Sequence, residues 1–198
     1  MTVRELTQQS PARHVVTVDF FLQMIAGGLL DEDDRVELLT GEMFQMTPIG
    51  RRHAAVVKRL LYFWTSQSLE DVLVSIQDPI RIDARSLPEL DVALIRRRDD
   101  FYANAYPGPE DVWLLIEVAD SSLTYDTERK LPLYASAAIP EVWIVNLIDN
   151  CIDRHLTPNA QGYRLRKRFL PGDKIAPARF PAATLDVREA LSLPGKAA

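Results

Sequence analysis

The sequence predicts an α/β or α+β fold in which helices pack on a mixed β-sheet. Three observations support this. One long amphipathic helix is expected from residue 53 to about residue 70, and several short apolar segments follow it with strand character. Residues 112–145 have the pattern of a strand, a crossover helix and a parallel strand. The 198 residues are 47% hydrophobic, which is enough for one domain with its own core.

The N-terminal third predicts a helix and a hairpin. Residues 1–16 are polar and aperiodic, so we expect a flexible arm. Thr17 is a suitable N-cap for a first helix, which the glycine pair at 27–28 would end. Two apolar runs around Thr40 and Gly41 then indicate a β-hairpin at 35–46.

The remaining elements follow from apolar patterning. In the helix beginning at His53, apolar residues recur at helical spacing. A second helix is expected over 127–138, although Pro132 makes its start uncertain. We therefore expect a single domain over 17–192, followed by a frayed tail at 193–198. Strands are predicted at 72–76, 80–82, 91–95, 112–118, 141–145, 152–156 and 163–169, with a turn at 158–162 between the last two.

Composition excludes several classes of protein. The net charge of −5 argues against a bulk electrostatic binder of nucleic acid, so any such contact needs a local basic patch. A single cysteine excludes an internal disulfide framework and a multi-cysteine zinc site. Neither a signal-peptide pattern nor a run long enough to span a bilayer is visible, so we expect a cytoplasmic protein without a membrane partner.

Two carboxylates interrupt otherwise apolar strands. Asp91 opens one strand and Glu117 lies inside another. A carboxylate in a buried strand is costly unless it is paired or binds a metal. Together the two could hold Mg²⁺, which takes one or two protein carboxylates and completes its shell with water and phosphate oxygens. The alternative is that Asp91 lies in water at a strand edge and Glu117 pairs with an arginine.

A lysine could reach the same place from the crossover helix. Asp126, Lys130 and Tyr134 are spaced i, i+4 and i+8, so they share one helix face. If that face lies over the end of the Glu117 strand, the ammonium could support the attacking water or the charge of the transition state. The alternative is a surface ion pair between Asp126 and Lys130, which would contribute little.

An ordered series of short motifs resembles a known family. The motifs are Val36-Glu37-Leu38-Leu39-Thr40-Gly41-Glu42, Pro48 and His53, Pro88-Glu89-Leu90-Asp91-Val92-Ala93, Glu117-Val118-Ala119-Asp120-Ser121-Ser122, and Asp126, Lys130, Tyr134 with Glu141-Val142-Trp143-Ile144-Val145. The series is similar to the Uma2 family, a bacterial group of restriction-endonuclease-like proteins assigned to the PD-(D/E)XK nuclease superfamily. The resemblance implies a restriction-endonuclease-like mixed β-sheet core flanked by helices.

The resemblance also implies roles for individual residues. Asp91 and Glu117 match the two acidic metal ligands of the family. Lys130 matches a lysine moved to the following helix, since the usual position two residues after the acid is alanine here. Glu37 resembles an additional upstream acid, although a hairpin glutamate is usually solvated. His53 matches a frequent family histidine that could orient phosphate or water, and its alternative is a solvated residue at a helix start.

Two functions from different classes follow. The favoured one is a Mg²⁺-dependent endonuclease, with Mn²⁺ as a substitute, that hydrolyses phosphodiester bonds of nucleic acid, most readily DNA. A homodimer could then cut two strands. The alternative is a catalytically inactive nuclease-like fold that serves as a binding or assembly module. Phosphate contacts could come from basic runs at 51–59, 96–98 and 164–168, each of which could instead be a solvated face.

Overall fold

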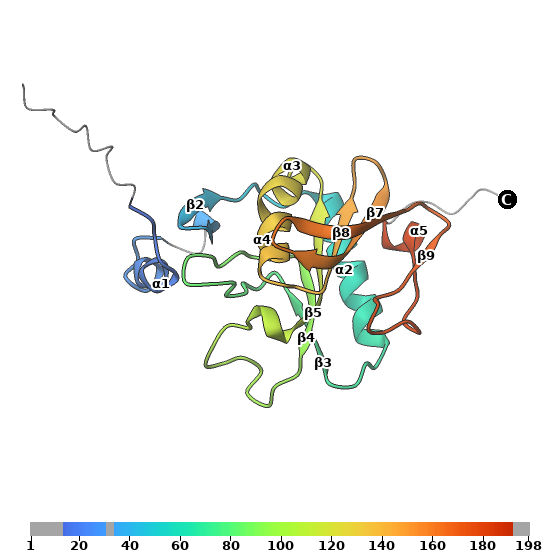
Figure 1. Ribbon diagram of the computed structural model, residues 1–198, viewed down its shortest axis with the longest axis horizontal. Coiled ribbons are helices and arrows are strands. Elements are labelled where there is room, and N and C mark those ends of the chain that lie inside the picture. Colours follow the sequence, from blue (N-terminus) through green and yellow to red (C-terminus); the bar gives the residue numbers. More distant parts are fainter. Residues whose placement is uncertain (1–13, 31–33, 192–198) are drawn as a thin grey trace, which may run out of the picture.

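A six-stranded mixed sheet forms the centre of the molecule, with strand order β3-β4-β5-β6-β7-β8 (Figure 1). The computed structural model describes residues 14–30 and 34–191. The predicted arm at 1–16 therefore lies outside the described residues except for 14–16, and the predicted tail at 193–198 lies wholly outside them. Among the described residues, no helix is both long enough and apolar enough to cross a membrane.

The β5–β6 pair is the one parallel pair of this sheet, and the other four pairs are antiparallel. This is the strand–crossover–strand unit predicted at 112–145, because the helical segment between 123 and 136 connects the two parallel strands. The strands are β3 (Val72–Ile76), β4 (Val92–Arg96), β5 (Val112–Ala119), β6 (Glu141–Asn146), β7 (Cys151–Asn159) and β8 (Gly162–Phe169).

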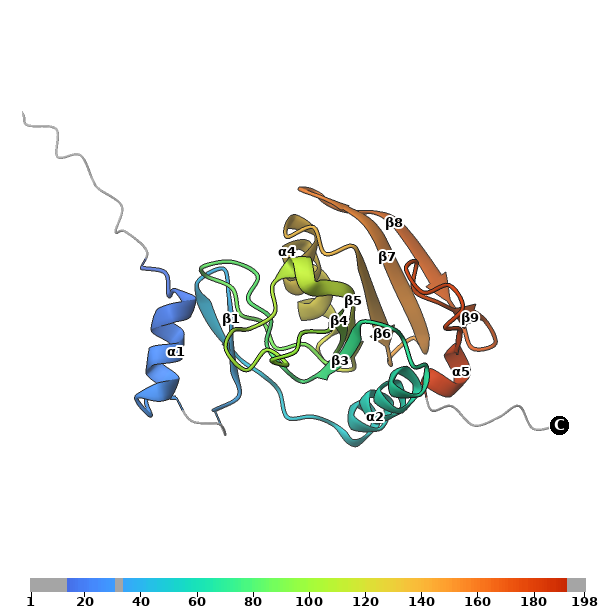
Figure 2. The ribbon, with the colours of Figure 1, turned by 90° about the horizontal axis from the view of Figure 1, so that it is seen from below.

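Helices cover both faces of the sheet, as Figure 2 shows. On one face lie α2 (Arg51–Ser66) and α5 (Val187–Ala190), whose apolar side chains pack on alternate residues of β4 and β5 such as Leu94 and Ile116. On the other face lies the segment of α3 (Leu123–Tyr125), η3 (Asp126–Lys130) and α4 (Leu131–Ser136), which packs on the intervening residues such as Leu115. Because side chains alternate along a strand, β5 serves two cores at once.

The crossover helix contains one wider turn, η3, of the π type. The Leu131 N–H donates to the Asp126 carbonyl, a bond one residue longer than in an α-helix. Pro132 follows directly, inside this continuous helical run, and because it has no N–H it donates no hydrogen bond to the wider turn before it. The helix therefore continues through the proline and begins at Leu123, earlier than the predicted residue 127.

The N-terminal elements form a separate small unit beside the sheet. α1 (Val18–Ala26) begins after Thr17, whose hydroxyl accepts from the Phe20 N–H as predicted for an N-cap, and it ends at Gly27. The hairpin of β1 (Val36–Leu39) and β2 (Glu42–Gln45) turns at Gly41, which has a φ of +83°. A small apolar cluster joins the hairpin to α1 within this unit. Two short strands, β9 (Lys174–Ile175) and β10 (Leu185–Asp186), pair near the C-terminus.

Three further predictions of elements were wrong. The long helix spans 51–66 and not 53–70, because Gly50 serves as its N-cap. The segment 80–82 forms no strand of the sheet; Ile80 is buried, but its N–H donates to Pro88 within an irregular loop. β7 continues to Asn159, so the turn before β8 is shorter than the predicted 158–162.

Candidate active site

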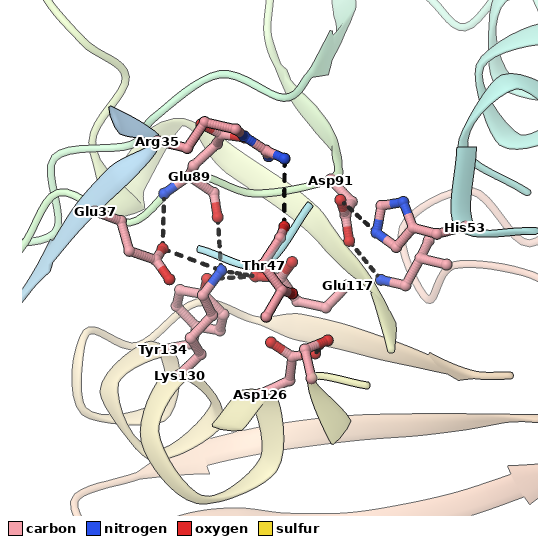
Figure 3. A network of polar contacts seen from close by, with 12 residues as sticks. Arg35, Glu37, Thr47, His53, Glu89, Asp91, Glu117, Asp126, Lys130 and Tyr134 are labelled. Atoms are coloured by element: carbon pink, nitrogen blue, oxygen red, sulfur yellow. Dashed lines mark hydrogen bonds and ion pairs between the residues drawn. The ribbon is translucent and has the colours of Figure 1, made fainter. Parts of the chain in front are cut away.

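A pocket of about 400 Å³ opens where β4 begins and β5 ends. Antiparallel pairing of β4 with β5 brings these two strand ends together. Loops beyond them, the hairpin β1–β2, the start of α2 and the crossover helix complete the walls. The titratable side chains that line it are Arg35, Glu37, His53, Glu89, Asp91, Glu117, Asp120, Tyr125, Asp126 and Lys130, most of which Figure 3 shows.

Asp91 is fixed through both of its carboxylate oxygens. Its Oδ2 accepts a hydrogen bond of 2.7 Å from the Val118 N–H of β5, and its Oδ1 lies 3.0 Å from His53 Nε2. Burial lowers the pKa of His53, but the hydrogen bond and the charge of Asp91 outweigh burial, so the pKa is raised. The other ring nitrogen, Nδ1, is buried and has no hydrogen-bond partner among the described residues. The alternatives of a solvated Asp91 and a solvated His53 are therefore wrong, since their side chains are 17% and 13% exposed.

Glu117 lies on the side of β5 that faces the crossover helix and is 2% exposed. The Tyr134 hydroxyl donates to its Oε1 at 2.6 Å, and Lys130 Nζ lies 3.4 Å from the same oxygen. Burial raises the pKa of Glu117 well above its usual range, and the charges of Asp91 and Asp126 act in the same direction, against the attraction of Lys130. Glu117 pairs with a lysine and not with an arginine, which corrects the alternative drawn from the sequence.

Lys130 is a buried cation with three acceptors around it. Its Nζ donates to the Glu89 carbonyl at 2.7 Å and lies 3.2 Å from Glu37 Oε2 and 3.4 Å from Glu117 Oε1. Two of these contacts, to Glu89 and Glu117, are hydrogen bonds, and the third is an ion pair with Glu37. Burial lowers the pKa of Lys130, but the carboxylates of Glu117 and Glu37 outweigh burial and raise it. The side chain therefore stays charged at neutral pH.

Asp126 does not form the surface ion pair with Lys130 that the sequence offered as an alternative. Both side chains are buried, and the Asp126 carboxylate instead accepts a 2.7 Å hydrogen bond from the Ser122 hydroxyl. Burial raises the pKa of Asp126 to about 6, although Lys130 and Ser122 oppose that shift. Asp126 therefore adds to the density of carboxylates in the pocket.

Glu37 comes from the hairpin and is 2% exposed, so it is not the solvated hairpin residue that its position suggests. Its Oε2 accepts from the Glu89 N–H at 3.1 Å and contacts Lys130. Glu89 thus joins Glu37 and Lys130 through its backbone, while its side chain lies 3.4 Å from Arg35. Sequence reasoning missed Glu89 and Arg35. The one available signal was that Glu89 lies two residues before Asp91, a spacing that places side chains on one side of an extended chain.

Asp91 and Glu117 have the donor chemistry that a divalent ion requires. Both offer carboxylate oxygens, both line the pocket, and the charge of Asp91 contributes to the raised pKa of Glu117, which a bound cation would relieve. Within residues 14–30 and 34–191, no group of three or more His, Cys, Asp or Glu is arranged to hold a metal. Two carboxylates with water and substrate oxygens suit Mg²⁺, so the residues fit the ion.

Comparison with known proteins agrees with this architecture. The model of the Uma2 family, described as "Putative restriction endonuclease", matches residues 18–188. The crystal structure of "a putative nuclease belonging to DUF820" from Anabaena variabilis superposes with a TM-score of 0.71, covering 89% of this chain and 98% of that one at 14% identity. That likeness shows the nuclease-like fold. No curated protein matches. Because the family model covers most of the sequence, this chain belongs to the Uma2 family.

Proposed function

We propose that this protein is a metal-dependent endonuclease that hydrolyses phosphodiester bonds of nucleic acid, most readily DNA. The observation that carries the proposal is the convergence of Glu37, Asp91, Glu117 and Lys130, which are distant in sequence, around one pocket. The description of the family and that of the structural neighbour both support nuclease activity. Restriction-endonuclease-like proteins typically use divalent metals, which the carboxylates of this pocket suit.

Asp91 and Glu117 would hold Mg²⁺, with Mn²⁺ as a substitute. The ion would supply Lewis acidity to a phosphoryl oxygen and to the attacking water. His53 fixes one oxygen of Asp91, and the Val118 N–H fixes the other. Tyr134 holds Oε1 of Glu117, so that its carboxylate plane is set before a ligand arrives. Such fixed orientation of metal ligands by surrounding hydrogen bonds commonly affects affinity and activity 10- to 100-fold, as an order of magnitude.

Lys130 acts in this proposal mainly as a positioning residue. Its ammonium joins Glu37 to Glu117 and is held in place by two hydrogen bonds and one further ion pair. Its positive charge still offsets the carboxylates of the pocket. Glu37 in turn holds Lys130, which explains why a hairpin residue outside the main sheet belongs to the site.

Cleavage assays test the proposal directly. Plasmid and single-stranded DNA are incubated with Mg²⁺ or Mn²⁺ and wild-type protein, Asp91→Asn or Glu117→Gln. Both variants keep the side-chain shape but lose a charge, and we expect cleavage to fall to background. Glu128→Gln is the matched control, because Glu128 is exposed on η3 and does not line the pocket. Equal cleavage by wild type and both pocket variants would eliminate the mechanism.

The same pocket gives some support to the alternative, a catalytically inactive binding or assembly module. Both oxygens of Asp91 contact other groups of the protein, and the ammonium of Lys130 is held by two hydrogen bonds and one further ion pair. Calorimetric titration with Mn²⁺ separates the two functions. Metal uptake by wild type that Glu117→Gln abolishes supports the nuclease, whereas no uptake by wild type supports the module. Sedimentation of the protein tests the proposed homodimer.

A further inference from the structure

The outward face of α2 is basic and contains no acidic residue. None of the 16 residues of this helix is Asp or Glu. Its buried face packs on the sheet through Val56, Val57, Leu60 and Trp64. Its exposed face carries Arg51, Arg52, Lys58 and Arg59. This local excess of positive charge is unusual in a chain whose net charge is −5.

Most cations of the other two basic runs have contacts of their own. In the run at 96–98, Arg98 pairs with Asp100 at 3.0 Å, and Arg96 lies over the ring of Trp113 at 5.1 Å. In the run at 164–168, Arg166 and Arg168 each approach one buried carboxylate at 2.8 Å, that of Asp153.

The cations of α2 differ from these. Within the part of the chain that the structure describes, Arg51, Lys58 and Arg59 have no carboxylate within ion-pair distance. Arg52 donates to the Leu147 carbonyl and to the Asn150 side chain, which fixes the first turn of the helix to the β6–β7 turn. Three positive charges on this face are therefore left for a ligand.

The N-terminal end of the basic face is next in sequence to residues of the pocket wall. Gly50, the N-cap of α2, and His53 both line the pocket, and Arg51 and Arg52 lie between them in sequence. From Arg51 to Arg59 the helix rises about 12 Å, which equals the rise of three to four nucleotides along the axis of duplex DNA, at about 3.4 Å each. A strand lying on this face would meet the pocket at the end of the helix.

We propose that the outward face of α2, through Arg51, Lys58 and Arg59, binds the phosphate backbone of the nucleic acid next to the bond that enters the pocket. This inference rests on the proposed function and adds to it the path of the substrate. Carboxylates line the pocket and the whole chain is acidic, so phosphates are repelled unless a neighbouring surface attracts them. Phosphate contacts of this kind position nucleic acid without reading its sequence.

Binding measured without cleavage tests this surface. Fluorescence anisotropy follows a labelled DNA duplex in EDTA, over a series of KCl concentrations, for wild type and the triple variant Arg51→Gln, Lys58→Gln, Arg59→Gln. Losing three phosphate contacts lowers the slope of log Kobs against log salt by about 2.7. The corresponding loss of affinity at 0.1 M KCl is roughly 100- to 500-fold. The control triple variant removes the same charge from exposed residues elsewhere: Arg97→Gln, Arg164→Gln, Lys174→Gln.

The possible outcomes separate this inference from the proposed function. Equal salt slopes for the two triple variants, or no binding by wild type at any salt, would overturn the binding surface even if cleavage depends on Asp91 and Glu117. A selective loss in the α2 variant supports the surface even if wild type never cleaves DNA, a result that would refute the nuclease alone. Thermal unfolding confirms that both triple variants are folded, as expected for exposed positions.

Discussion

Replacing Lys130 by methionine removes the one buried ammonium that joins the two carboxylates Glu37 and Glu117. Methionine keeps most of the apolar stem, so the substitution deletes the charge with little change of volume. Three contacts are lost: 2.7 Å to the Glu89 carbonyl, 3.2 Å to Glu37 and 3.4 Å to Glu117. The side chain is 7% exposed, so water cannot replace them without rearrangement.

The expected cost is large because the two carboxylates stay behind. Breaking a buried ion pair by removing one partner destabilises a protein by about 3–5 kcal/mol, since the remaining charge is left without compensation. For a domain of this size, 1 kcal/mol shifts Tm by about 2–4 °C, so we expect Tm to fall by about 6–20 °C. The cause can be isolated with a second change. In a Lys130→Met protein, the further change Glu117→Gln should recover part of the loss, because it neutralises one stranded carboxylate.

Urea and thermal unfolding of four proteins measure this effect: wild type, Lys130→Met, the double variant and Arg129→Met. Arg129 is the exposed neighbour of Lys130 on the same turn, so its replacement should change the free energy of unfolding by less than about 0.5 kcal/mol. If Lys130→Met were as stable as Arg129→Met, the ammonium would not be holding the carboxylates together. The positioning role assigned to Lys130 would then be refuted.

Two further predictions concern the β7–β8 pair. Asp153→Asn should lower the free energy of unfolding by about 1.5–3 kcal/mol, because a buried carboxylate loses charge-assisted hydrogen bonds of 2.8–2.9 Å from Arg166 and Arg168. Asp149→Asn removes a 3.7 Å exposed ion pair with Arg168 and keeps a side-chain oxygen that can accept from Asn146, so it should cost under about 1 kcal/mol. Equal costs of the two changes in chemical unfolding would contradict this. Burial and then the charge of Arg166 lower the pKa of His155 to about 4, so its stabilising contribution is complete above pH 6.5 and is lost as pH falls towards 4. Stability measured against pH should therefore decline more steeply in this window for wild type than for His155→Gln, and parallel curves would refute it.

Most of the sheet could be predicted because the sequence patterns that indicate strands and turns are local. Apolar strands, turn residues and a capped helix are set by neighbouring residues, and these predictions located the hairpin and every strand of the six-stranded sheet but missed the two-residue strands β9 and β10. The segment at 80–82 failed because Ile80 is buried by a loop and not by a strand, and a short apolar run cannot distinguish the two. The start of the crossover helix was misplaced because a π-turn accommodates Pro132, a compensation with no sequence pattern of its own.

Some residues of the candidate site could also be predicted from the sequence, and the burial of one could not. Asp91 and Glu117 were visible because acids are rare in apolar strands, and Lys130 was visible because it shares a helix face with Tyr134. The burial of Glu37 was not visible, since it depends on the packing of a separate hairpin against the sheet. Only the ordered resemblance to a family pointed to it. The roles of these residues in catalysis stay predictions until variants are assayed.

The π-turn at 126–130 has consequences for changes of chain length. Its closing bond, from the Leu131 N–H to the Asp126 carbonyl, spans one residue more than an α-helical turn does. Deleting one residue from this turn would close it with α-helical spacing, so the helical segments on either side would keep their directions. Insertions and deletions at this point of the gene would therefore change which side chains stand at the pocket wall while every strand of the sheet stayed in register.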